Sequence, residues 1–443
     1  MAQNFLSCDR DQVLLLPPDL GDWLPEGHLA RFVIATVGAL DLSGVYAYYR
    51  RDGHGRPAHD PAMMVALVLY AYAVGVTSSR AIERRCVEDV AFRFITADRQ
   101  PDHATIARFL IRHRSAVCEL FDGVLGLCAR AGMVRVGTIA VDSTKLAANA
   151  SADQNYSYEG LRGLAERIIE EAIETDRRED ELFGDKRGDE LPEQLADPRT
   201  RQARIRELLE QAQAEREQVE SERQALHERQ AQREQTPRGQ RAPGRPPGPR
   251  PSRHQRALWT KKYNVTDPDS GIVRHRGMLM QGYNVQAAVA DGQVVLATQI
   301  SSVSSDGGQL KPMLDAAEHA LTRIGVADCP GVVVADTGYW SAPQIARLRA
   351  RQRRVLVPPA DRKRGRHASP EVARMHADLT SPQGHADYER RQQIIEPVFA
   401  HWKHIRGITR VWRRGRQAVQ AEIDLIATSH NLLKLYRATP TTA

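Results

Sequence analysis

The sequence predicts an α/β protein: a mixed sheet flanked by helices, preceded by an all-helical domain and interrupted by a helical insertion after the first strand. Two changes of pattern lead to this prediction. Residues 1–135 show apolar side chains at helical spacing, and short β-branched runs begin near residue 136. Residues 157–262 are polar and lack those runs. We therefore expect a helical domain (1–135), an α/β domain in two parts (136–156 and 263–443) and an insertion (157–262).

The helical domain is expected to consist of short helices joined by tight turns. Asp60 can cap a helix that begins with a proline and ends at Gly75, the stretch SSRAIERRCVEDVAFRFI suits a second helix, and Asp102 precedes a third. Arg108 and Arg112 lie off the apolar stripe of the third helix. This basic outer surface suits a helix-turn-helix type DNA-binding unit, although ordinary helical bundles also carry solvated arginines.

Five apolar runs predict the strands of the sheet, namely VGTIAVDSTKL, GYNVQAAVA, QVVLATQIS, GVVVADTGY and RRVLVPPA. The helical stretches GGQLKPMLDAAEHALTRIG and SAPQIARLRARQ separate the later runs. Three strands, a helix, a strand, a helix, a strand and further helix describe a sheet covered by helices.

The insertion combines a long helical pattern with a basic, proline-rich segment. Ile205, Ala212, Val219 and Leu226 repeat every seven residues, but arginines occupy the places of a second apolar row, so we expect a helical hairpin or a loose coiled arm. Residues 236–256 hold six arginines, six prolines and no acidic residue. Such a segment can be a solvated linker, but its like charges also suit contact with a phosphate backbone, which we favour.

Composition places the chain among globular proteins of a reducing compartment. Of its 443 residues 42% are hydrophobic, and 62 lysines and arginines against 55 acidic residues give a net charge of +7. The amino terminus lacks a secretory signal, and the most apolar run, 61–76, is shorter than the roughly 20 residues that span a bilayer. No Cys-x-x-Cys pair occurs, which argues against a zinc ribbon or redox motif and favours the cytoplasm; the cysteines are Cys8, Cys86, Cys118, Cys128 and Cys329.

Two aspartates follow apolar strands, where a buried strand alone gains nothing from an acid. Asp142 follows Ile-Ala-Val in TIAVDSTKL, and Asp336 follows three valines and an alanine in VVVADTGYW. If both strands are neighbours in one sheet, the carboxylates converge, and like charges so close require a shared multivalent cation. Mg²⁺, which prefers oxygen ligands and few carboxylates, is the natural candidate.

A third acid, Glu396, lies beside the apolar stripe of a predicted helix, and Lys403 follows two helical turns later on nearly the same side. Each acid alone has an ordinary explanation, because an aspartate at a strand end most often caps a turn or helix. The combination of all three in an α/β region with basic segments favours a catalytic site. Asp306 is expected to cap a helix, and the histidines at 401 and 404 are expected to be exposed rather than metal ligands.

Several blocks along the chain are distinctive: VDSTKLAANAS, DKRGDELPEQL, QGYNVQAAV, VVVADTGYW and IIEPVFAHWKHIRG. In this order they resemble bacterial insertion-sequence transposases of the DDE type, over residues 40–435. The resemblance implies an RNase H-like catalytic domain in which Asp142, Asp336 and Glu396 are the catalytic acids and hold two Mg²⁺ ions, or Mn²⁺ in their place. It also implies a nucleoid-associated homodimer that acts on double-stranded DNA, both the element's ends and the target.

One motif departs from that family. Related transposases carry Tyr, Arg, Glu and Lys around the last acid, with two, three and six residues between them. Lys403 keeps its distance from Glu396, and Tyr388 keeps its distance from Arg391, but four residues separate Arg391 from Glu396. The expected contact of Tyr388 and Arg391 with phosphate is therefore in question.

Basic side chains close to these blocks are the candidates for DNA contact. Trp402 and Trp412 accompany them and could stack on a base, although their helical spacing favours a place in the core. Two other functions share these features: an RNase H-like metal-dependent nuclease or resolvase, and a catalytically inactive, transposase-derived DNA-binding regulator. The predicted DNA-binding residues are Arg108, Arg112, Lys145, Arg391, Lys403, Arg406, Arg413 and Arg414.

Overall fold

The computed structural model describes residues 19–49, 57–164, 198–235, 262–275, 277–303, 305–328, 330–359 and 370–439. The chain divides into two compact units, Met1–Ala147 with Tyr283–Ala443 and Ala148–Gly282. We call these the core unit and the insertion unit. The basic segment 236–256 lies outside the described residues.

The core unit begins with short helices, as predicted. Asp60 accepts a hydrogen bond from the Met63 backbone N–H (2.9 Å) and so caps α3, which confirms the predicted start. The stretch expected to form one helix after Ser78 is instead two helices, because the backbone of Asp89 is extended and its side chain caps the next helix. The elements are η1 (Leu20–Trp23), α1 (Leu29–Gly38), α2 (Ser43–Tyr46), α3 (Pro61–Ala73), α4 (Ser79–Glu88), α5 (Val90–Thr96), α6 (His103–Arg112) and α7 (Arg114–Arg130).

The predicted mixed sheet is confirmed, and within the core unit its strands lie in the order β6–β5–β1–β7–β8. Strands β1, β7 and β8 are parallel neighbours, whereas β5 and β6 are antiparallel. The β-branched and alanine-rich runs are buried on both faces, as a sheet covered by helices requires. The strands are β1 (Arg135–Ala147), β5 (Met278–Asp291), β6 (Val294–Ser301), β7 (Val332–Ala335) and β8 (Val355–Leu356).

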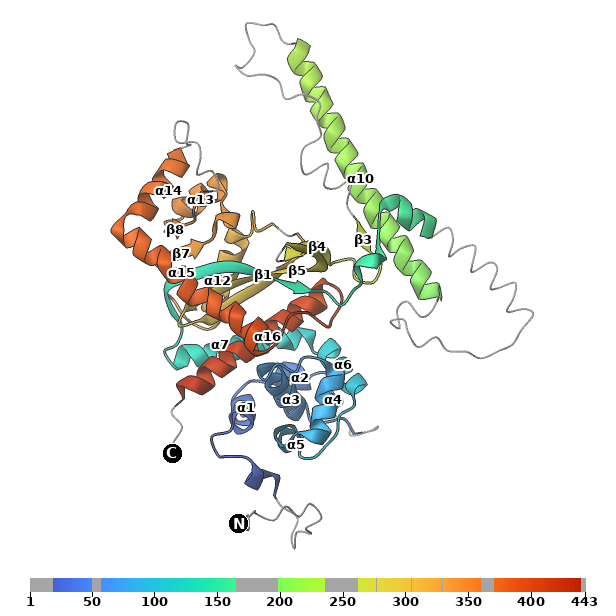
Figure 1. Cartoon of the computed structure of the whole chain (residues 1–443), viewed down its shortest axis with the longest axis vertical. Coiled ribbons are helices and arrows are strands. Elements are labelled where there is room, and N and C mark those ends of the chain that lie inside the picture. The colour runs from blue at the N-terminus through green and yellow to red at the C-terminus, as the bar shows by residue number, and fades with distance from the viewer. Residues whose placement is uncertain are drawn as a thin grey trace, which may run out of the picture. The chain divides into compact units, whose positions relative to one another are not determined.

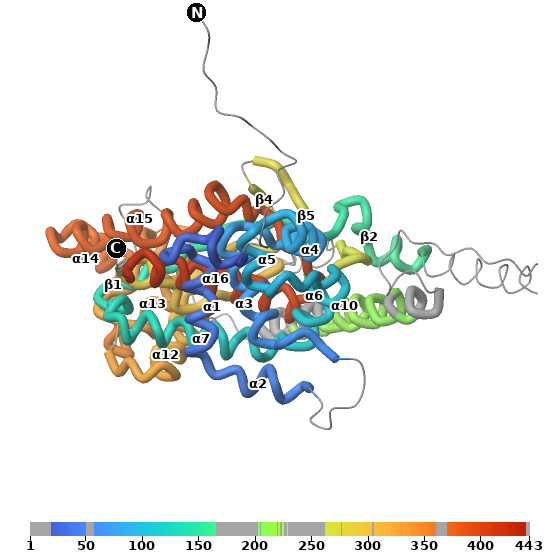
Figure 2. Tube along the Cα trace, turned by 90° about the horizontal axis from the view of Figure 1, so that it is seen from below, coloured from blue at the N-terminus to red at the C-terminus, as the bar shows by residue number. Residues whose placement is uncertain are grey.

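Helices that follow the strands cover the sheet and connect it to the amino-terminal helices. Helix α15 packs on β1 and β7, and α16 packs on β6, α7 and α3 (Figure 1). From below, α1, α3 and α16 lie side by side (Figure 2). The elements are α12 (Leu310–Arg323), α13 (Ala342–Ala350), η4 (Thr337–Tyr339), α14 (Pro370–Thr380), α15 (Pro382–Ala400), a π-helical turn η5 (His401–Ile405) and α16 (Arg416–Ala438).

The insertion unit contains the long helix that the sequence predicts, α10 (Pro198–Gln235). Ile205 and Ala212 of the heptad pattern are buried, in a small core that also holds Leu161 and Tyr263. The side chains of Val219 and Leu226 lie outside the described residues. Short strands β2 (Asn155–Tyr156) and β3 (Tyr263–Asn264) pair with each other, and β4 (Gly271–His275) pairs with the first residues of β5.

No helix in the described part of the chain is long and apolar enough to cross a membrane. The apolar run near residue 61 forms α3, a helix of 13 residues whose side chains are almost all buried, as expected.

Candidate active site

Asp142 lies on β1, and Asp336 directly follows the last residue of the adjacent parallel strand β7. The register of β1 and β7 pairs Val141 with Ala335, so the two aspartates are the next pair. Neighbouring strands lie about 4.8 Å apart, which brings the carboxylates together as the sequence predicted. One detail of that prediction is wrong: Asp142 does not end its strand. β1 continues to Ala147 because β5 still lies along its other edge, and only β7 ends.

Asp142 is a poorly solvated carboxylate held by two donors. Its Oδ1 accepts a hydrogen bond from the Ser143 N–H (2.7 Å), and its Oδ2 accepts one from Nη1 of Arg391 (2.8 Å). Burial raises the pKa of Asp142 to about 6, and the charge of Asp336 acts in the same direction, against the Ser143 hydrogen bond and the Arg391 charge. The charges of Asp336 and Asp306 add to the desolvation of Asp142, and a cation placed between the two aspartates would favour their charged forms.

Asp336 caps the turn that follows its strand and still belongs to the pair. Its Oδ1 accepts a hydrogen bond from the Gly338 N–H (2.8 Å) at the start of η4. A Cβ at Gly338 would fall 3.0 Å from Oδ1 of Asp336 and 3.4 Å from Oδ2 of Asp306, so a side chain there would press on both carboxylates. The cap uses one oxygen of Asp336, and among the described residues the other accepts no hydrogen bond.

Arg391 connects Glu396 to the aspartate pair. Arg391 of α15 bonds to Asp142, and its Nη2 lies 3.7 Å from Oε1 of Glu396, whose side chain is 55% exposed. Tyr388 lies one turn before Arg391; burial raises the pKa of Tyr388, while the charge of Arg391 opposes that shift. The long guanidinium thus reaches Asp142 and Glu396 although the sequence spacing is one residue too long.

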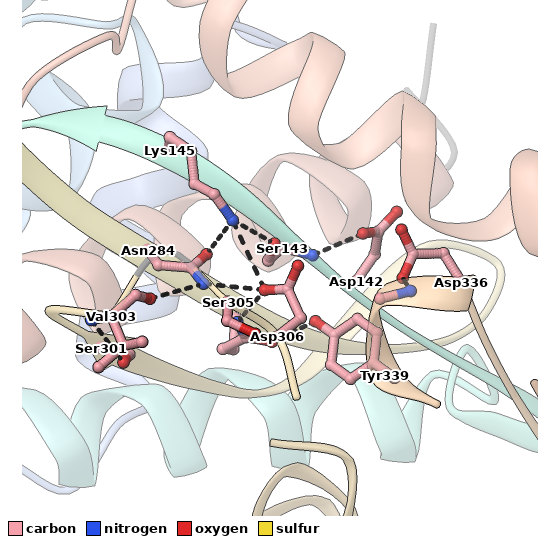
Figure 3. Close-up of polar contacts among 12 residues, drawn as sticks. Asp142, Ser143, Lys145, Asn284, Ser301, Val303, Ser305, Asp306, Asp336 and Tyr339 are labelled. Carbon is pink, nitrogen blue, oxygen red and sulfur yellow. Dashed lines mark hydrogen bonds and ion pairs between the residues drawn. The ribbon is translucent and has the colours of Figure 1, made fainter. Parts of the chain in front are cut away.

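A polar network beside the aspartates was not predicted from the sequence (Figure 3). Nζ of Lys145 donates to Ser143 Oγ (2.9 Å) and Asn284 Oδ1 (2.7 Å), and it lies 3.5 Å from Asp306 Oδ1. Asp306 Oδ1 also accepts hydrogen bonds from the side chains of Asn284 and Gln286, each 2.8 Å long. Strand β1, strand β5 and the loop before α12 are joined by these contacts.

Asp306 was expected to cap a helix, and that expectation is wrong. The residue before α12 is Gln309, which makes no side-chain cap, and the Asp306 carboxylate turns instead to the amides of β5. Burial acts to raise the pKa of Asp306, but those hydrogen bonds and the Lys145 ammonium hold it below its usual value. A usable signal was present, because Asn284 and Gln286 are amides two residues apart in the buried part of a strand.

Two family models match the chain. The family described as "Transposase domain (DUF772)" matches residues 18–112, and the family described as "Transposase DDE domain" matches residues 260–432, which include Asp336 and Glu396. The chain belongs to the insertion-sequence transposases of the DDE type. Its helical amino-terminal region and mixed sheet are those of an α/β RNase H-like transposase. No curated protein and no solved structure matches it.

Three of the basic side chains predicted to contact DNA are largely buried in the transposase. Lys145 and Arg391 belong to the site itself, with 14% of each side chain exposed. The prediction that Arg406 contacts DNA does not fit the structure. Arg406 is 5% exposed and donates to the backbone carbonyls of Tyr72 and Ile426 and to Ser429 Oγ. It binds the carboxyl-terminal end of α3, where a cation satisfies backbone acceptors.

The other predicted cations of the transposase lie nearer the surface. Arg108, Arg112 and Arg414 are exposed, and Lys403 and Arg413 are partly exposed. Two tryptophans were expected in the core: Trp402 is fully buried, but Trp412 is 42% exposed and donates to Thr77 Oγ1 (2.9 Å). His404 is exposed as expected, whereas His401 is partly buried, and burial lowers its pKa to about 4.

The aspartate pair suits a Mg²⁺ ion better than the full set of three acids does. No group of three or more His, Cys, Asp or Glu side chains in the described ranges is arranged to hold a metal ion. Asp142 and Asp336 offer hard oxygen ligands at adjacent positions, and Mg²⁺ needs only one or two carboxylates when waters and phosphates complete its shell. Glu396 faces Arg391 in this arrangement, so its part in metal binding stays a prediction.

Proposed function

We propose that this transposase binds the terminal inverted repeats of an insertion sequence and catalyses metal-dependent DNA cleavage and strand transfer. The proposal is supported above all by the register that places Asp142 next to Asp336. The charge of Asp336 also adds to the effect of burial in raising the pKa of Asp142. The family supports transposition as the overall activity. A homodimer that holds both ends of the element at once is part of the proposal.

Asp142 and Asp336 would hold the metal ion, and Glu396 is the third candidate ligand. Bound Mg²⁺ or Mn²⁺ would supply Lewis acidity at the phosphodiester. Arg391 links Asp142 to Glu396 and carries a charge suited to a phosphate oxygen. The contacts among Lys145, Asp306 and Asn284 hold β1 against β5 and against the loop before α12. They thereby set the position of Asp142.

A joining assay tests this function. The purified transposase is incubated with Mg²⁺, a supercoiled plasmid and a duplex that ends in the inverted repeat bordering the gene. The label is at the 5′ end of the strand whose 3′-hydroxyl attacks the plasmid. We expect label to become covalently joined to the plasmid, and no joining with EDTA or with a duplex whose 3′ end lacks its hydroxyl. Cleavage without joining would instead identify a nuclease or resolvase. Binding without either reaction would identify a DNA-binding regulator.

A further inference from the structure

A basic groove lies in the core unit between α4 and the segment 407–412. Its volume is about 560 Å³. One wall is the turn Gly75–Ser78 with the exposed side of α4, and the other is the segment with Thr409, Arg410 and Trp412. No residue of the groove belongs to the aspartate site described above.

The two walls are fixed to each other, so the groove is preformed. Gly75 has φ +84°, and a Cβ there would fall 2.3 Å from the carbonyl oxygen of Arg406, so the backbones meet where no side chain fits. The indole N–H of Trp412 donates to Thr77 Oγ1 across the groove. The buried carboxylate of Glu422 accepts the backbone N–H of Trp412 (3.0 Å) and holds the segment from behind.

The charge of the groove suits an anion. Arg84 and Arg85 of α4 and Arg410 of the segment line it, against a single acid, Glu88. Arg85 also lies 3.5 Å from Asp89, but with half of the arginine side chain exposed such a pair is weak and can exchange for a phosphate. The Arg410 guanidinium lies 5.2 Å from the centre of the Trp412 ring, a flat surface beside the cations.

The groove is continuous with the strand that carries Asp142. The backbone N–H of Ala147 donates to the Thr409 carbonyl (3.0 Å), and the Val411 N–H donates to the Ala147 carbonyl (2.9 Å). Ala147 lies five residues beyond Asp142, about 16 Å at about 3.3 Å per residue of extended strand. That length corresponds to about five nucleotides of duplex at about 3.4 Å per step along one strand.

We propose that this groove binds the sugar-phosphate backbone of the element-end DNA, about five nucleotides from the phosphodiester held at Asp142 and Asp336. The proposal rests on the proposed function, because it assumes that DNA reaches the aspartate site. Arg84, Arg85 and Arg410 contact phosphates, which positions the strand without reading its sequence.

Salt-dependent binding tests the arginines of the groove. The doubly substituted Arg84→Ala/Arg85→Ala protein is compared with Arg80→Ala, which removes an exposed arginine of the same helix outside the groove. Binding of a fluorescent pre-cleaved end duplex is measured in Ca²⁺ over a range of salt concentrations. We expect about tenfold weaker binding by the double variant, and a slope of log K against log salt that is shallower by about one for each phosphate that the variant no longer binds. Arg80→Ala should keep the wild-type slope.

Neutral phosphates locate the contact on the DNA. Methylphosphonates are placed one at a time along the strand, and each position is tested with wild-type and doubly substituted protein. We expect substitution about five nucleotides from the 3′ end to weaken wild-type binding and to have little further effect on the variant. Equal sensitivity of both proteins at every position, or equal salt slopes, would show that the groove does not bind this DNA, even if wild-type protein joins DNA normally. A wild-type protein that joins no DNA would instead overturn the proposed function. Equal thermal unfolding of the variants excludes misfolding.

Discussion

Asp142→Asn and Asp336→Asn are each expected to lower the rate of cleavage at the element's end by on the order of 10³-fold or more, because a neutral amide is a much weaker ligand for a divalent cation. Glu396→Gln is expected to have a similar effect if the third acid joins the site. The measurement is a single-turnover cleavage assay with Mg²⁺ on a labelled duplex in which flanking DNA continues beyond the inverted repeat. DNA affinity, measured in Ca²⁺, should stay within a few-fold of wild type.

The structure makes these substitutions clean tests. Asparagine is as good a cap as aspartate, so Asp336→Asn can keep the hydrogen bond from the Gly338 N–H and the turn that depends on it. Asp315→Asn is the matched control, because it removes a carboxylate of α12 whose partners are Lys311 and Arg351 rather than the site. Cleavage by Asp336→Asn at the wild-type rate would show that Asp336 is not a catalytic residue.

Arg406→Ala is expected to destabilise the core unit by about 2–4 kcal/mol, since it leaves buried carbonyl acceptors at Tyr72 and Ile426 without their donor and leaves a cavity. Thermal unfolding followed by circular dichroism should show a melting temperature lower by about 5–10 °C. The result separates a structural cation from a DNA-contacting one.

Arg414→Ala provides the comparison for Arg406→Ala, because Arg414 is exposed in the same basic run. It should unfold at the wild-type temperature and bind DNA more weakly. If Arg406→Ala instead unfolds like wild type and binds DNA more weakly with a shallower salt slope, then Arg406 contacts DNA and its buried position is not the functional one.

Much of the fold was predictable because its strands are short apolar runs separated by helical stretches of clear period. The strand and helix order from β1 to β8 follows that pattern. The nearness of Asp142 and Asp336 was predictable on the condition that their strands are neighbours in the sheet. The insertion, β5, β6 and α12 separate β1 from β7 in the sequence, and the sheet nevertheless pairs these two strands in parallel.

The errors arise where the outcome depends on partners distant in sequence. Whether β1 stops at Asp142 depends on β5, which continues beside it, and no local pattern reveals this. The sequence around Asp306 is typical of a helix cap, but its carboxylate accepts hydrogen bonds from buried amides about twenty residues away instead. Arg406 and Arg414 belong to one basic run, and only the packing of α3 against α16 makes one of them a core residue.

The most direct test of the account is whether Asp142 and Asp336 hold one divalent cation between them. Mn²⁺ binding to the transposase on an uncleavable end duplex can be followed by electron paramagnetic resonance. We expect Asp142→Asn and Asp336→Asn each to weaken Mn²⁺ binding by about tenfold or more, and Asp315→Asn to leave it unchanged.

The pH dependence of Mn²⁺ binding tests whether the pKa of Asp142 is raised. Because the pKa of Asp142 is raised to about 6, a proton competes with the metal below that pH, and wild-type affinity should fall by about tenfold per pH unit there. An unshifted aspartate would keep its affinity down to about pH 4. Wild-type Mn²⁺ affinity in both asparagine variants would contradict a shared metal site.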